Sequence, residues 1–171
     1  FIVRETKGRP RHEIARQWIS QLVAAIRKHD KRHLITVGLV SWSLDRPGLN
    51  SGFVPEKIAG ELDFIAMHIY PQRGKVDEAL KIVEGFAAAG KPVVIEETFP
   101  LKCGQDEMER FIDQSQSVAA GWISFYWGKT PEQCRTGGTI GDAIMANWLE
   151  LFPKKMTDLS CRAIATDDPI R

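Results

Sequence analysis

The feature that most limits the fold of this chain is a regular alternation of amphipathic segments with short apolar ones. Five segments show the apolar spacing of a helix, at residues 12–30, 55–61, 75–90, 105–120 and 139–152. Between them lie four apolar runs of strand length, at residues 33–43, 62–71, 91–97 and 121–128. This alternation predicts parallel strands joined by crossover helices, and hence an α/β fold.

Alternation alone is compatible with a doubly wound sheet or with a barrel. A nucleotide-binding sheet usually carries a Gly-rich turn after its first strand, but the sequence contains no G-x-G-x-x-G and no P-loop. Instead, each predicted strand ends in residues able to bind or react, namely Trp42, then His68 and Tyr70, then Glu96 and Glu97, then Tyr126 and Trp127. In barrel enzymes the carboxyl ends of the strands carry the active site.

Composition excludes several classes of partner. The 171 residues are 43% apolar and carry a net charge of +1, which predicts one globular domain with no electrostatic footprint for nucleic acid. No run of 18 apolar residues occurs and no signal peptide is visible, so we predict no membrane partner. The chain begins at Phe1 and not at a Met, which we interpret as a sign of a fragment or a processed chain.

Three motifs at successive strand ends resemble one enzyme family. HIY at 68–70, KPVVIEE at 91–97 and YWG at 126–128 are similar to the last strands of the glycoside hydrolases of family 5, the retaining cellulase and mannanase type of (β/α)8 TIM barrel. The resemblance covers roughly residues 34–150. It implies that residues 1–171 form the C-terminal half of a single barrel, strands five to eight, with residues 153–171 as an irregular tail.

The resemblance also implies roles for individual residues. Glu97 would be the nucleophile, Tyr70 would hydrogen-bond its carboxylate, His68 would contact the sugar, and Trp127 would stack on the sugar, with Trp42 as a second platform. Side chains alternate along a strand, so we expect Val93, Ile95 and Glu97 to face the barrel interior together with His68 and Tyr70. Glu96 would then point to the other side, as a surface charge or in an ion pair with a helix.

The sequence departs from the family pattern in two places. Glu97 is followed by Thr98-Phe99-Pro100, where the family usually has an aromatic residue and Gly. A retaining glycosidase also needs a second carboxyl group, which the family supplies in an Asn-Glu-Pro motif on its fourth strand. No Asn-Glu occurs here, and Glu5 follows no strand of useful length. We therefore expect the acid/base Glu in an N-terminal half, and we predict that the isolated half-barrel is weakly folded or self-associates.

The predicted function is hydrolysis of β-linked glycosidic bonds in oligo- or polysaccharides with retention, without cofactor or metal. The alternative is a non-catalytic carbohydrate-binding or structural half-barrel. A metal-dependent barrel hydrolase is disfavoured, because three of the four histidines, His12, His29 and His33, lie in or beside the first predicted helix.

Two cysteines follow strand ends at similar distances. Cys103 lies six residues after Glu97, and Cys134 lies seven residues after Trp127, so both are expected in neighbouring loops at the same end of the sheet. A disulfide between them is one expectation and would suit a secreted or periplasmic enzyme. Two free thiols are the other.

Overall fold

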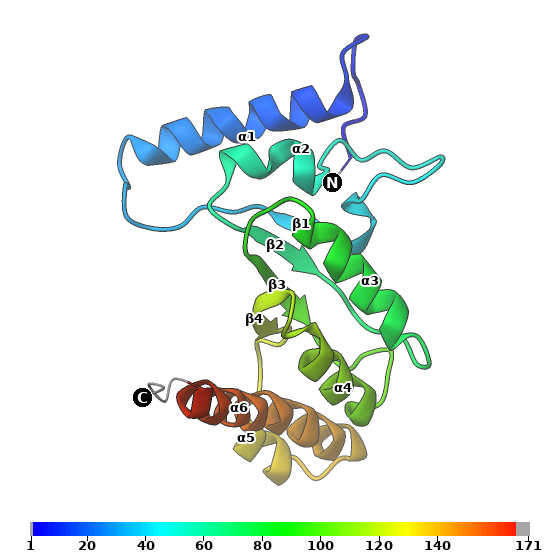
Figure 1. Ribbon diagram of the computed structural model, residues 1–171. Helices are drawn as coiled ribbons and strands as arrows, with labels where there is room; N and C mark the ends of the chain where they lie inside the picture. The colour runs from blue at the N-terminus through cyan, green and yellow to red at the C-terminus, as the bar shows by residue number, and fades with distance from the viewer. Residues whose placement is uncertain (1, 167–171) are drawn as a thin grey trace.

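The four predicted strands form one parallel sheet, in the order β1-β2-β3-β4, within the part of the chain that the structure describes. The structure is a computed structural model that describes residues 2–166, with side chains up to residue 159. Neighbours along the chain are neighbours in the sheet, as expected for successive crossover units. Figure 1 shows α1 and α2 beside β1 at one end of the molecule, and α5 and α6 at the other.

The elements follow the predicted order, with two short 3-10 turns and one additional helix. In chain order they are α1 (Arg11–Arg27), β1 (Gly38–Val40), η1 (Ser41–Ser43), α2 (Pro55–Ile58), η2 (Ala59–Glu61), β2 (Ile65–His68), α3 (Val76–Ala87), β3 (Val93–Thr98), α4 (Gln105–Ser115), β4 (Ala119–Ser124), α5 (Pro131–Thr136) and α6 (Ile140–Thr166). The added helix α5 begins after Thr130, whose hydroxyl accepts a hydrogen bond from the backbone N–H of Gln133.

The helices cover one face of the sheet and leave the other face open. Core residues of the strands, such as Leu39, Met67 and Ile95, are fully buried against apolar residues of α1, α3, α4 and α6. These three residues pair with one another across the sheet and form one row. The next row across the sheet consists of Gly38, Ala66, Val94 and Gly121, and it points to the opposite face of the sheet. We call this face the open face.

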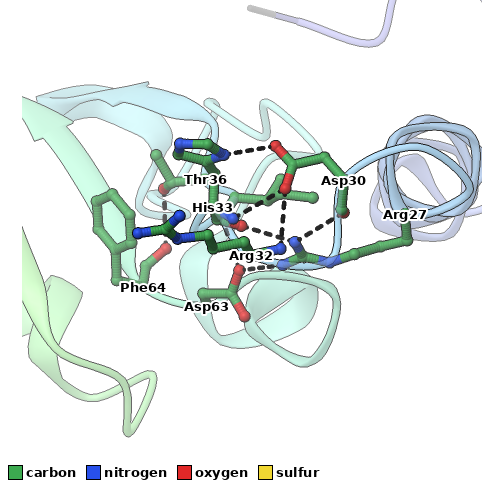
Figure 2. Close-up of polar contacts among 8 residues, drawn as sticks. Arg27, Asp30, Arg32, His33, Thr36, Asp63 and Phe64 are labelled. Atoms are coloured by element: carbon green, nitrogen blue, oxygen red, sulfur yellow. Dashed lines mark hydrogen bonds and ion pairs between the residues drawn. The ribbon is translucent and has the colours of Figure 1, made fainter.

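A polar cluster fixes the turn between α1 and β1 at the amino end of the strands (Figure 2). Asp30 accepts hydrogen bonds from the backbone N–H groups of Arg32 and His33, at 2.8 and 3.0 Å. Asp63, which precedes β2, accepts from Arg27 Nη2 at 2.5 Å and from the backbone N–H of Ile35. Both carboxylates therefore hold backbone groups of the connecting segment in place.

The predicted irregular tail at 153–171 is wrong over residues 153–166, because α6 continues through Pro153 to Thr166. Proline in a helix interior usually kinks or ends the helix, so the sequence suggested an end there. Tertiary contacts outweigh this preference, since Lys155 is buried and its Nζ lies 2.8 Å from Asp113 of α4 and 3.9 Å from Glu109. Residues 167–171 lie outside the described residues.

The predicted fold class is confirmed as a partial barrel of parallel βα units. Within the described residues the sheet does not close on itself, and β1 and β4 form its two edges. No helix of the described chain is both long and apolar enough to cross a membrane.

Candidate active site

A β-bulge near the end of β3 decides which side chains gather at the carboxyl ends of the strands. Met67 of β2 pairs with Ile95 of β3, but the next residue of β2, His68, pairs with Glu97. Glu96 is therefore an extra residue on β3. A bulge of this kind interrupts the alternation of side chains along the strand.

The other edge of β3 and the pattern of burial agree with this bulge. Ile95 pairs with Trp122 of β4, and Thr98 pairs with Ser124, so β3 again has one residue more than its partner. Val93, Ile95 and Thr98 are buried on the helix side, whereas the residues between Ile95 and Thr98 are only half-buried. Both glutamates of β3 thus lie toward the open face.

The strict alternation predicted from the sequence is therefore wrong at this strand. It grouped Val93 and Ile95 with His68, but these two residues face the helices. It also placed Glu96 on the side opposite to Glu97, whereas both carboxylates contact His68. The physical reason is the extra residue, which a period of two cannot represent.

Glu97 is held by two side chains of the neighbouring strand end. The Tyr70 hydroxyl donates a hydrogen bond to Glu97 Oε1 at 2.5 Å, and His68 Nδ1 lies 3.3 Å from Glu97 Oε2. On the other side of the imidazole ring, His68 Nε2 lies 2.9 Å from Glu96 Oε1. The structure thus brings together His68, Tyr70 and Glu97, as the resemblance implies, and it adds Glu96.

The environment of Tyr70 keeps its hydroxyl protonated. Burial raises the pKa of Tyr70 well above its ordinary value of 10.0, and the adjacent Glu97 carboxylate raises it further. A neutral phenol can donate its hydrogen to a carboxylate, whereas a phenolate cannot. Tyr70 is therefore a permanent donor to Glu97 near neutral pH.

A pocket of about 290 Å³ opens beside these residues. Trp42 of η1, His68, Tyr70 and Glu97 line this pocket. Further lining residues are Lys75 just before α3, Glu78 of α3 and Lys102 of the loop after β3. Trp42 therefore lies on the same pocket as the predicted nucleophile. An aromatic ring beside a carboxylate is a suitable surface for one face of a sugar ring.

The loop edges of this pocket are connected by Glu107 at the start of α4. Its carboxylate accepts hydrogen bonds from the backbone N–H groups of Gly74, at 2.6 Å, and Gly104, at 3.1 Å. These two bonds lower the pKa of Glu107 below its ordinary value. The segment after β2 is thereby attached to the segment after β3.

The structure does not bring Trp127 to this pocket. Its indole is fully exposed after the end of β4. The aromatic residue after β4 that reaches the site is instead Phe125, whose ring meets that of Tyr70 edge to face at 6.0 Å. Phe125 lies two residues before Trp127, so the alternation along a strand predicts that both point to the same face. The family resemblance nevertheless selected Trp127.

Of the two expectations for Cys103 and Cys134, the structure shows two buried free thiols and not a disulfide. Cys103 packs into the main core beside α4, and burial raises the pKa of its thiol to about 11. Cys134 belongs to α5, which packs on α6. Similar distances from strand ends did not reveal that Cys103 joins the main core whereas Cys134 lies on α5, outside that core cluster.

Sequence reasoning placed Glu96 on the side opposite to Glu97, and it gave Phe125 and Lys102 no role in this region. Lys102 and Phe125 follow strand ends, so a wider search of those segments could have found them. The described side chains contain no group of three or more His, Cys, Asp or Glu suited to hold a metal ion.

Comparison with known proteins supports the resemblance. No family model matches the chain. It is 24% identical to mannan endo-1,4-β-mannosidase 2 from Oryza sativa subsp. japonica, over 80% of this chain and 35% of that protein. The chain thus spans about a third of the curated relative that it matches. The predicted resemblance to family 5 glycoside hydrolases is confirmed by this similarity over part of the relative.

Two solved structures are similar to this chain. The endo-β-1,4-mannanase from Thermotoga petrophila is 18% identical and superposes with a TM-score of 0.54, over 75% of this chain and 34% of that chain. An exo-β-1,3-glucanase of glycoside hydrolase family 128 from Aureobasidium namibiae is 18% identical with a TM-score of 0.47, over 72% of this chain and 52% of that chain. The first of these likenesses shows the fold of a partial barrel.

Proposed function

We propose that this chain supplies the nucleophile side of the active site of a retaining glycoside hydrolase that cleaves β-linked sugars. The observation that carries the proposal is the 2.5 Å hydrogen bond from Tyr70 to Glu97, at adjacent strand ends and on a pocket with an aromatic wall. The similarity to a mannan endo-1,4-β-mannosidase supports a β-1,4-linked mannan as the first substrate to test.

The proposed reaction has two steps. A Glu97 oxygen attacks the anomeric carbon and forms an ester, the bond to the leaving oxygen breaks, and that oxygen takes a proton from a second carboxyl group. The same group, now a carboxylate, then removes a proton from water, which attacks the anomeric carbon and releases Glu97. Two inversions give net retention.

Within this reaction the neighbours of Glu97 have separate tasks. Tyr70 keeps the attacking carboxylate in one orientation, and His68 contacts its second oxygen. Trp42 offers an apolar face to the sugar ring inside the pocket. Trp127, fully exposed beyond β4, would act as a further platform for sugar units outside the pocket. Because no step above calls for a metal ion or an organic cofactor, we propose none.

The second carboxyl group is proposed to come from residues outside this chain. Retaining glycosidases place their two carboxyl groups about 5 Å apart across the sugar. The sheet is open within the described residues, and the chain spans about a third of its mannosidase relative. An N-terminal half-barrel of the same protein would close the sheet and present this group opposite Glu97.

The two ends of the open sheet suit such completion. At one end, Trp18, Leu22 and Ile26 of α1 form a half-exposed apolar stripe at helical spacing. At the other, Ile123 on the edge strand β4 is 56% exposed above an apolar groove beside α6. We therefore expect the isolated chain to self-associate or melt without cooperativity. A cooperative, monomeric melt in sedimentation and calorimetry would contradict this part of the proposal.

The decisive experiment compares Glu97→Gln with Glu96→Gln in the complete product of the gene, on β-1,4-mannan. Glu97→Gln should lower kcat by at least about 10⁴-fold, since an amide cannot act as the nucleophile. Glu96→Gln should retain far more activity and so serves as the matched control for register. Wild-type turnover by Glu97→Gln would overturn the proposed role.

A chemical test separates the nucleophile from the acid/base group. In Glu97→Gly, added azide should replace the missing carboxylate and yield a glycosyl azide of inverted configuration, detectable by proton NMR. A glycosyl azide of retained configuration would identify the mutated group as the acid/base residue instead. Binding of mannan without any hydrolysis by the wild-type protein would favour the non-catalytic carbohydrate-binding alternative.

A further inference from the structure

His68 is held between two carboxylates of the same strand. Its Nε2 lies 2.9 Å from Glu96 Oε1, and its Nδ1 lies 3.3 Å from Glu97 Oε2. An ionised carboxylate only accepts hydrogen bonds, so the contact with Glu96 requires a hydrogen on His68 Nε2. The three side chains are between 26% and 29% exposed, so solvent screens these contacts only in part. The His68 ring is therefore hydrogen-bonded to Glu96 on one side and lies against Glu97 on the other.

The neighbouring strand β1 makes room for this contact. A Cβ atom added at Gly38 would lie 2.4 Å from Glu96 Oε1 and 3.0 Å from His68 Nε2. Distances this short exclude a side chain at position 38 unless the pair moves. A glycine inside a strand often marks such a close approach. Strands β1, β2 and β3 thus all contribute to the Glu96–His68 contact, through Gly38, His68 and Glu96. This argues against an accidental pairing of two surface side chains.

We propose that Glu96 is a positioning residue that accepts a hydrogen bond from His68 Nε2 and so holds the His68 ring beside Glu97. This inference rests on the proposed function and extends it to a residue outside the pocket. Without the hydrogen bond to Glu96, the ring could turn away from Glu97, whose second oxygen it contacts at 3.3 Å. The attacking carboxylate would then lose one of the two neighbours that orient it, His68 and Tyr70.

The charged groups around the ring leave this task to Glu96. From β3, Glu96 and Glu97 face the two ring nitrogens, and from β1 the backbone of Gly38 approaches. The other titratable side chains on the pocket that His68 lines are Tyr70, Lys75, Glu78 and Lys102. Glu96 does not line that pocket and acts through His68.

Kinetics of the complete gene product on β-1,4-mannan test the proposal. Glu96→Gln, which keeps the shape of the side chain, and Gly38→Ala, which displaces the contact, should each lower kcat by about 10- to 100-fold, as expected for a partner that orients a functional group. KM should change less than about twofold, because neither residue lines the pocket. Glu96→Asp, which keeps the charge, should recover part of the lost kcat.

A second glycine provides the matched control for Gly38. Gly121 lies in the same row of the sheet, and a Cβ atom added there would meet nothing within 4 Å. Gly121→Ala should therefore leave kcat unchanged. Equal losses in Gly121→Ala and Gly38→Ala would overturn the inference, because they would trace the effect to the sheet and not to the contact.

Nitrogen NMR of histidine-labelled protein tests the hydrogen bond of the ring independently of activity. His68 should carry its hydrogen on Nε2 in the wild type, and the Nε2 resonance should shift in Glu96→Gln and Gly38→Ala but not in Gly121→Ala. An unchanged Nε2 resonance in Glu96→Gln, or wild-type kcat in Glu96→Gln, would overturn the inference. Failure of the proposed function has a different signature, namely full activity of Glu97→Gln, and leaves the NMR result able to decide the inference alone.

Discussion

Two clusters of histidine and carboxylate lie at opposite ends of the same strands, and they are built differently. In the amino-end cluster of Arg27, Asp30, His33 and Asp63, the carboxylates accept hydrogen bonds from backbone N–H groups (Figure 2). In the carboxyl-end cluster of His68, Tyr70, Glu96 and Glu97, the hydrogen bonds to the carboxylates come from side chains.

The difference teaches how to separate a structural carboxylate from a functional one. A backbone donor fixes the chain, and its loss costs stability. A side-chain donor orients a carboxylate that still has acceptor sites free to meet a ligand. Exposure agrees, because the His33 side chain is 81% exposed whereas that of His68 is 29% exposed beside a pocket. In barrels the carboxyl end serves chemistry and the amino end serves stability.

The largest effect that would sharpen this comparison is expected at Tyr70. Tyr70→Phe removes the donor to Glu97 but keeps the ring and its edge contact with Phe125. We expect kcat on β-1,4-mannan to fall about a hundredfold. The free energy of unfolding should change by less than about 1 kcal/mol, because the site is partly open to water. A large loss of stability in urea unfolding, with kcat retained, would break the comparison.

The next effect belongs to the amino-end cluster. Asp63→Ala removes the acceptor of both Arg27 Nη2 and the Ile35 backbone N–H. The free energy of unfolding should fall by about 1 kcal/mol, the net contribution of hydrogen bonds whose donors water can still reach. Asp63→Asn, which keeps a neutral acceptor, should lose less, and kcat per folded molecule should match the wild type in both. A loss of kcat in folded Asp63→Ala would show that the two ends are not separate in function.

The smallest effect is a dependence of stability on acid. Hydrogen bonds from the backbone of His33 and Arg32 lower the pKa of Asp30 from its ordinary 3.8 to about 2. The unfolded chain therefore binds this proton at higher pH than the folded chain, so the contribution of Asp30 is present above about pH 4 and is lost as pH falls toward 2. Urea unfolding between these values should show a steeper loss for the wild type than for Asp30→Asn. Parallel curves would contradict this prediction.

The order of the fold could be predicted because it depends on local patterns. Apolar spacing located the major helices and the four strands, since burial on one side selects the same period in sequence and in structure. Strand length was harder to predict, because hydrogen bonding to β2 limits β1 to Gly38–Val40 although the apolar run is longer. The path of α6 beyond Pro153 depends on the contact of Lys155 with α4, which no local pattern contains.

The candidate site was predictable in its members more than in its geometry. The resemblance selected His68, Tyr70 and Glu97, and these residues do meet. The contact of Glu96 with His68 could not be predicted, because it depends on a bulge that is defined by the registers of two neighbouring strands. The family pattern predicted that Trp127 lies at the site, whereas its indole is fully exposed after the end of β4.

The bulge in β3 also changes how many functional groups one strand can offer. Ile95 and Thr98 both face the helices, and a regular pleat would allow a single residue of the opposite face between two such positions. The inserted residue permits two. The end of the strand can thus present two functional side chains on the open face in place of one, while Ile95 and Thr98 stay buried in the core. The number of residues between the buried Ile95 and Thr98 decides how many side chains β3 contributes to this site. Insertions and deletions between these two residues would therefore change the site as much as substitutions would.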